Sequence, residues 1–146
     1  MNFNYGATNA LEGCKPVTKG GCTSSNSQIN FWTMAGESGN DMFRMTGNVI
    51  HEIGHALNYQ YDQNPVKDMP YYLYTNRDLI LQPNSLAPMP NACDDCEYYQ
   101  FNREPNSPSE TYADMFVAWM YNVWNSNPAN ALDVSIAQTW MEKWTP

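Results

Sequence analysis

The sequence predicts a single α+β domain that spans residues 1–146. The chain has 146 residues, which is enough to bury one core but too few to bury two. One segment near the N-terminus alternates in the way that is typical of a strand, and three later segments repeat apolar residues at helical spacing. We therefore expect a compact domain with a small sheet, one central helix and C-terminal helices.

The strand is predicted at residues 28–34, the segment QINFWTM. Its Ile, Phe and Thr alternate with Asn, Trp and Met, and Gly36 and Gly39 follow as turn residues. Residues 1–26 are rich in Gly, Asn, Ser and Thr, a composition that favours loops. We expect this N-terminal arm to wrap around the core with little regular structure.

The central helix is predicted from about Asp41 to about Tyr61, because apolar residues recur there at intervals of three and four. Asp62, Asn64 and Pro65 then favour its end. Residues 65–106 contain six of the ten prolines, which predicts irregular chain that forms the walls of a substrate cleft. A short helix at 76–81 is the one regular element indicated in that stretch.

The C-terminal part begins with the segment Ser107-Pro-Ser-Glu110, which has the features of a helix start. A serine can cap the helix, a proline occupies the first turn, and a glutamate follows three residues after the cap. We expect a helix from Pro108 to about Asn125. Pro128 interrupts it, and helical spacing resumes from 129 to 144.

The charge of the chain disfavours some classes of partner. A formal net charge of -8 and a pI near 4.4 repel phosphate backbones, so we expect no nucleic acid. No segment approaches the roughly 20 apolar residues of a membrane-spanning helix, so we expect no membrane partner. The polar start MNFNYGATNA lacks the basic and apolar regions of a signal peptide, so we expect this sequence to carry no signal or propeptide. We also expect a monomer.

The four cysteines of the chain indicate the cellular compartment in which we expect the protein. Cys14, Cys22, Cys93 and Cys96 form an even set in a small chain that is poor in Lys and rich in Asn, Tyr and Trp. This profile favours disulfides and a secreted or extracellular protein, with three pairings open. The alternative is a structural zinc site of all four cysteines, because Cys93 and Cys96 have the spacing of a zinc knuckle. A redox role is a third reading, which no surrounding strand–helix pattern favours.

The only two histidines lie in a His-Glu-x-x-His motif on the predicted central helix. Residues four apart share a helix face, so His51 and His55 can offer two imidazole nitrogens to one zinc ion. Glu52 projects beside the metal and can take a proton from zinc-bound water. Chance would place two histidines and a glutamate in this pattern about once in fifteen hundred sequences, so the motif predicts a Zn²⁺ cofactor.

The third zinc ligand is predicted to be a carboxylate. The chain has no third histidine, and Asn58 and Tyr61 stand where a metzincin has its Gly and His. Glu110 and Asp114 lie four apart near the start of the next strong helix, so one can bind zinc and the other can fix the tautomer of a zinc-bound histidine. The competing reading makes Glu110 a capping-box residue. Glu104, Glu97 and Asp95 are the next candidate ligands.

The segments HEIGHALN and SETYAD resemble the gluzincin pattern of thermolysin-like peptidases. The resemblance covers residues 46–120 and implies a zincin fold in which His51, His55 and Glu110 bind zinc, Glu52 is the general base and Asp114 orients a histidine. The interval between the two segments is nearer that of lethal-factor-like and Pro-Pro endopeptidase-like gluzincins than that of thermolysin. Those relatives place a tyrosine shortly before the ligand glutamate to bind the oxyanion.

The oxyanion donor has four candidates in this sequence. Arg103 stands near the position of the relatives' tyrosine, Tyr98 and Tyr99 lie further back, and Tyr112 follows the ligand glutamate. Each can donate a hydrogen bond to a developing negative charge, although tyrosines are more often wall or core residues. The pair at 94–95 could bind calcium, and a surface turn between two cysteines is the simpler account.

The function predicted from these residues is zinc-dependent hydrolysis of a peptide bond in a peptide or protein, as an endopeptidase. Two rival functions stay open at this point. The metal could activate water against a non-peptide substrate, because the motif does not specify what the water attacks. Alternatively, the chain could be a non-catalytic binding module, which an intact Glu52 disfavours.

Overall fold

The computed structural model describes residues 2–5, 21–25, 28–31, 41–81 and 107–145. Three short strands come first, followed by the helices. The strands are β1 (Asn2–Tyr5), β2 (Gly21–Ser25) and β3 (Gln28–Phe31). The helices are α1 (Asp41–Gln60), α2 (Asn64–Lys67), α3 (Tyr71–Thr75), α4 (Arg77–Ile80), α5 (Pro108–Tyr121) and α6 (Ala131–Trp144), with a single 3-10 turn, η1 (Pro128–Asn130), before α6.

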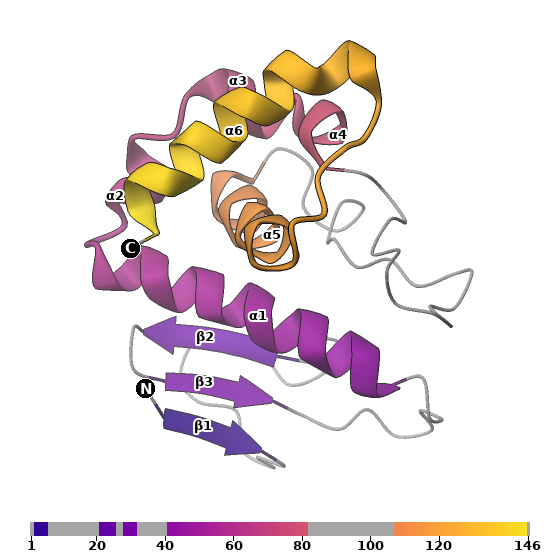
Figure 1. Cartoon of the computed structure of the whole chain (residues 1–146). Coiled ribbons are helices and arrows are strands. Elements are labelled where there is room, and N and C mark those ends of the chain that lie inside the picture. The colour runs from indigo at the N-terminus through magenta and orange to yellow at the C-terminus, as the bar shows by residue number, and fades with distance from the viewer. Residues whose placement is uncertain (1, 6–20, 26–27, 32–40, 82–106, 146) are drawn as a thin grey trace.

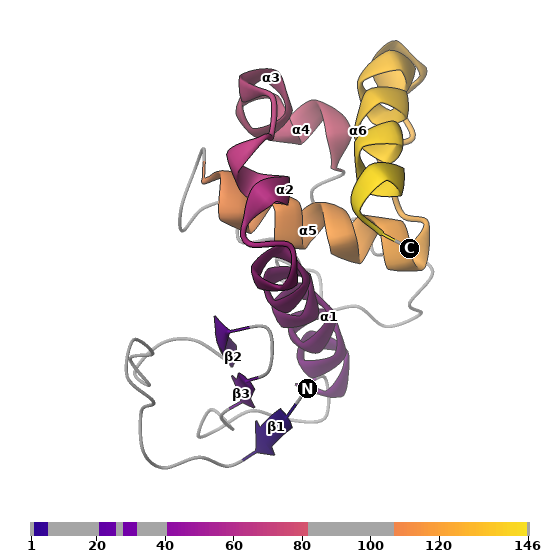
Figure 2. The same ribbon diagram turned by 90° about the vertical axis from the view of Figure 1, so that its left-hand side faces the viewer.

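Helix α1 lies between the strands and the other helices (Figure 1). The strands are in the order β1-β3-β2, with β1 parallel and β2 antiparallel to β3. On the other side of α1, α5 crosses it and α6 lies beyond α5, as Figure 2 shows from the side. Among the described helices, none is long and apolar enough to cross a membrane.

The predicted α+β zincin class is wrong for the described residues, which are predominantly helical. The helices of 20, 14 and 14 residues dominate, whereas each strand has only four or five residues. The strand prediction at 28–34 corresponds to β3, of which residues 32–34 lie outside the described part. The difference has a physical reason. One alternating segment predicts a strand, but most of the buried apolar residues of the described chain belong to helices.

The core is built mainly around α5. All residues from Thr111 to Ala118 are buried, so this part of α5 is enclosed on every side. The buried apolar residues that pack around it from the other helices are Leu73, Ile80, Val134, Ala137 and Met141, and Met69 joins them from the segment between α2 and α3. A second, smaller cluster joins Ile29 of β3 to Ala56 of α1, which attaches the strands to the other face of α1.

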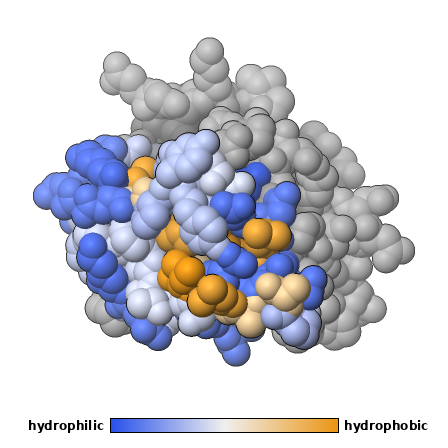
Figure 3. All heavy atoms as spheres, turned by 90° about the horizontal axis from the view of Figure 1, so that it is seen from above, coloured by the Kyte–Doolittle hydropathy of each residue, from blue (hydrophilic) through white to orange (hydrophobic). Residues whose placement is uncertain are grey.

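The surface on the α6 side carries several exposed apolar side chains. Leu132 and Ile136 of α6 and Leu79 of α4 are all exposed. Figure 3 looks onto this side and shows apolar side chains among hydrophilic ones. In Figure 1 this side is the one farthest from the strands.

The segment 65–106 differs from its prediction where the structure describes it. Three short helices, α2 to α4, occupy most of 64–80, and α4 corresponds to the short helix predicted at 76–81. They pack against α5 and α6, so they form part of the core and are not loose cleft walls. Pro65 is the second residue of α2 and Pro70 directly precedes α3, positions at which a proline costs no helix hydrogen bond. Residues 82–106 lie outside the described part.

The ends of the long helices follow the sequence closely, with one exception. Helix α1 ends at Gln60 and α6 ends at Trp144, as predicted. Helix α5 begins at Pro108 as predicted but ends at Tyr121, four residues before the predicted Asn125. The reason is Asn122, which takes a left-handed conformation with φ of 53° and closes the helix with backbone bonds to Ala118 and Trp119.

The N-terminal arm, predicted as loop, contains β1 and β2 in its described parts. The cysteine pairing stays a prediction. Cys14, Cys93 and Cys96 lie outside the described residues, and only the backbone of Cys22 is described, within β2.

Candidate metal centre

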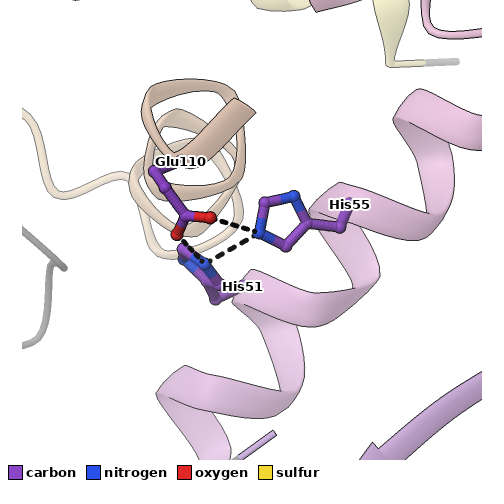
Figure 4. Close-up of side chains that lie close together, drawn as sticks. All are labelled: His51, His55 and Glu110. Carbon is purple, nitrogen blue, oxygen red and sulfur yellow. Dashed lines mark hydrogen bonds and ion pairs between the residues drawn. The ribbon is translucent and has the colours of Figure 1, made fainter. Parts of the chain in front are cut away.

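Two histidines on α1 and one glutamate on α5 point towards one another (Figure 4). His51 and His55 are one helical turn apart on α1 and share the face that packs against α5. Glu110 lies in the first turn of α5, and its carboxylate is next to the two histidine rings. The contact between α1 and α5 therefore brings together residues that are 59 positions apart in the chain.

The three side chains offer a triangle of ligand atoms. The two Nε2 atoms of His51 and His55 are 3.1 Å apart. Glu110 places Oε2 at 3.1 Å from Nε2 of His51 and Oε1 at 3.4 Å from Nε2 of His55. Zinc ligands at about 2.0–2.2 Å in tetrahedral geometry lie roughly 3.3–3.5 Å from one another. The three distances, 3.1, 3.1 and 3.4 Å, are close to this separation, and one ligand atom from each residue lies within 4.8 Å of the other two, so the group could hold a metal ion.

The other ring nitrogens of both histidines have their own partners. Nδ1 of His51 is 2.8 Å from Oδ1 of Asp114, and Nδ1 of His55 is 3.2 Å from Oγ of Ser109. If each Nδ1 donates its proton to these oxygens, both Nε2 atoms present lone pairs to the same point. Two lone pairs and a carboxylate at such distances repel one another unless a proton or a cation lies between them.

The capping alternative for Glu110 can be compared directly with the ligand alternative. Its backbone N–H donates to Oγ of Ser107 at 3.4 Å, so Ser107 caps α5 as the sequence indicated. The carboxylate of Glu110 contacts the two histidines. The helix cap therefore uses the backbone of Glu110 and leaves its side chain for the metal centre.

Burial and hydrogen bonds shift the ionisation of the centre strongly when no metal is bound. Burial disfavours the charged form of His51, but the hydrogen bonds to Asp114 and Glu110 outweigh it and raise the pKa of His51 to about 10. Burial acts to raise the pKa of Glu110, yet the bonds to His51 and His55 hold that pKa well below its usual range. Complete burial raises the pKa of Asp114, against the effect of His51. A proton on His51 thus takes the place that a cation would occupy.

We expect the metal-free protein to lose stability as the pH rises from 6.5 towards 10. The pKa of His51 is about 10 in the folded chain against an ordinary value of 6.5, so its stabilising effect is complete below pH 6.5 and is lost as the pH passes through about 10. Urea unfolding in chelator at pH 6, 8 and 10 measures this change. The variant His51→Gln should show a much smaller loss, and equal pH dependence in the two proteins would contradict the assignment.

Close packing between the helices sets the position of Glu110. A Cβ atom at Gly54 would lie 2.9 Å from Cα of Ala113 and 3.1 Å from Cβ of Phe116. The first of these is a backbone atom, so only a shift of a whole helix could relieve the contact. Gly54 therefore allows the close approach of α1 and α5 that brings Glu110 to His51 and His55.

We expect Gly54→Ala to lower both the melting temperature and the metal affinity. Alanine gains about 1 kcal/mol of helix propensity over glycine, but overpacking of a core costs about 1–3 kcal/mol. The second effect should dominate, because the nearest atom belongs to the backbone. Calorimetry and zinc titration measure the two effects, with Gln60→Ala at the exposed end of α1 as the control. A more stable Gly54→Ala protein with full zinc affinity would show that the helices do not need this approach.

Of the four candidate oxyanion donors, the structure describes only Tyr112. Tyr112 is fully buried in the cluster around α5, and burial raises its pKa to about 12. Among the described residues, its buried hydroxyl has no hydrogen-bond partner. Tyr98, Tyr99 and Arg103 lie outside the described residues. The alternative zinc ligands Glu104, Glu97 and Asp95 lie outside them too, as does Asp94, the other member of the candidate calcium-binding pair.

Three residues near the centre were not singled out from the sequence. Ser109 contacts His55, and Thr23 of β2 contacts Glu52. Arg77 of α4 is buried, and burial lowers its pKa. The nearby negative charges of Asp114 and Glu110 act in the opposite direction. Only Ser109 had a signal in the sequence, because it precedes the proposed ligand Glu110 in the first turn of the same helix. The contacts of Thr23 and Arg77 depend on tertiary structure.

Comparisons with protein-family models, with curated proteins and with solved structures found no match for this chain. The assignment of the centre therefore depends on its own geometry.

Proposed function

We propose that this protein is a zinc-dependent peptidase. The observation that carries the proposal is the short distances, 3.1–3.4 Å, between the ligand atoms of His51, His55 and Glu110. Glu52 follows His51 on the same helix. Two imidazole nitrogens and a carboxylate are a donor set that suits zinc, and three protein ligands leave one position open for catalysis. The site follows the gluzincin pattern of residues, while the predominantly helical fold supplies no support for that family.

Each residue has a distinct role in the proposed reaction. When bound here, zinc supplies a Lewis acid that activates water at neutral pH. His51, His55 and Glu110 would hold the ion, and Asp114 would keep His51 in the tautomer that leaves Nε2 free. Glu52 takes the proton from the attacking water and delivers it to the leaving amine.

A peptide substrate is supported by the position of β2. Among the described residues, β2 pairs only with β3, so it is an edge strand of the sheet. An extended peptide can add to such an edge through backbone hydrogen bonds. Thr23 of β2 lies 2.6 Å from the carboxylate of Glu52, so a peptide on that strand would lie close to the proposed base.

Incubation of the protein with a diverse peptide library tests the proposal. We expect cleavage by the zinc-loaded protein, none after treatment with a chelator, and recovery when zinc is added back. A parallel set of non-peptide amides and esters distinguishes a peptidase from another hydrolase. A zinc-loaded protein that cleaves neither set would contradict an enzymatic function.

A further inference from the structure

Glu52 accepts a hydrogen bond from strand β2, whereas the neighbouring residues His51 and His55 contact helix α5. Oγ1 of Thr23 lies 2.6 Å from Oε2 of Glu52 and 2.8 Å from the backbone carbonyl oxygen of the same residue. The side chain of Glu52 is buried, with a residue exposure of 5%. A buried carboxylate needs a hydrogen-bond donor, and Thr23 supplies one.

The structure explains why Thr23 faces α1. Thr23 stands opposite Ile29 in the antiparallel pairing of β2 and β3. Residues directly opposite each other point to the same face of a sheet, and Ile29 is buried against Ala56 of α1. The pairing shifts register between Thr23 and Ser25, and such irregularities re-aim side chains next to functional sites. Thr23 is therefore directed at the helix by the same packing that attaches the strands.

The polar residues of this part of helix α1 consequently have partners on two different elements. His51 and His55 contact Glu110 on α5, while Glu52, the residue after His51, accepts a hydrogen bond from Thr23 on β2. The metal ligands and the base are thus held by different elements. A hydroxyl has one proton, so Thr23 donates to one of the two oxygens of Glu52 at a time.

We infer that Thr23 is a positioning residue for Glu52: its hydroxyl holds Oε2 so that Oε1 is the oxygen offered to the water. This inference rests on the proposed function, in which Glu52 is the base. A carboxylate on a helix has several rotamers, and proton transfer requires hydrogen-bond geometry in one of them. Fixing the rotamer from the neighbouring strand raises the fraction of molecules that are ready to react.

Two substitutions separate the hydroxyl from the rest of the side chain. Thr23→Val keeps the shape and the strand preference but removes the donor, whereas Thr23→Ser keeps the donor. Because a hydrogen bond to a charged group is strong, we expect Thr23→Val to lower kcat about ten- to a hundredfold, with KM and zinc content unchanged. Thr23→Ser should stay close to the parent. Equal losses in the two variants, or none in Thr23→Val, would overturn the inference.

The background Glu52→Gln separates positioning from a purely structural role. If Thr23 acts through the carboxylate, Thr23→Val should cause no further loss of activity in the Glu52→Gln protein. A structural role would lower the residual activity again and would contradict the inference.

A second measurement does not depend on activity. In the zinc-loaded protein, the carbon-13 resonance of the Glu52 carboxyl group should move in Thr23→Val and stay in place in Thr23→Ser. If the parent cleaves no peptide, the proposed function fails, and this resonance alone decides whether Thr23 binds the carboxylate. An unmoved resonance in Thr23→Val would overturn the inference at any level of activity.

Discussion

The substitution Glu52→Gln is expected to reduce peptide cleavage by about a hundred- to ten-thousandfold and to leave zinc content unchanged. Glutamine has the same shape as glutamate but cannot accept the proton of the attacking water. None of the three residues in the ligand triangle is altered, and the amide oxygen can still accept a hydrogen bond from Thr23. The measurement is kcat/KM on a cleaved library peptide, with metal analysis of the same sample.

The control for this experiment is a matched change away from the centre. Glu142→Gln alters an exposed carboxylate on α6 and should leave both activity and zinc content as in the parent. Full activity of Glu52→Gln would remove Glu52 from the reaction. A loss of zinc in the same variant would instead mean that the residue supports the metal centre.

The substitution Glu110→Gln is expected to weaken zinc binding more than any change outside the ligand triangle. An amide oxygen is a poorer ligand than a carboxylate for a dication. Asp114 contacts His51, and loss of such a partner of a metal ligand lowers metal affinity or activity roughly ten- to a hundredfold. The loss of zinc affinity in Glu110→Gln should therefore be larger than that in Asp114→Asn. Competition with a chromogenic chelator measures both affinities.

The stability of the metal-free proteins is the accompanying control. The cap of α5 uses the backbone N–H of Glu110 and Oγ of Ser107, so it survives the change to glutamine and helix content should stay close to that of the parent. Zinc affinity equal to that of the parent in Glu110→Gln would place the third ligand elsewhere. Glu104, Glu97 and Asp95 would then be the residues to test.

The helices and the polar residues of the centre could be predicted from the sequence because both follow local rules. The spacing of His51 and His55 fixes their shared face, and the serine and proline before Glu110 fix the start of α5. The two motifs could therefore be placed at the right points of two helices. The structure then places their side chains within 3.1–3.4 Å of one another.

The fold class and the contacts of Thr23 could not be predicted, because they depend on residues far apart in the chain. β2 carries no alternation that distinguishes it from a loop, and its pairing with β3 is what directs Thr23 at Glu52. Helices α2 and α3 have too few residues for a periodic pattern, and α3 is stabilised by burial of Leu73 in the core around α5. Tertiary packing determines these elements.

The central claim is that the three side chains on α1 and α5 bind one zinc ion, and X-ray absorption at the zinc edge tests it most directly. We predict about one zinc per chain with two imidazole nitrogens, carboxylate oxygen and no sulfur in its ligand shell, and loss of that zinc in both His51→Ala and His55→Ala. A spectrum with sulfur ligands, or zinc retained in either variant, would contradict the account and favour the four-cysteine site.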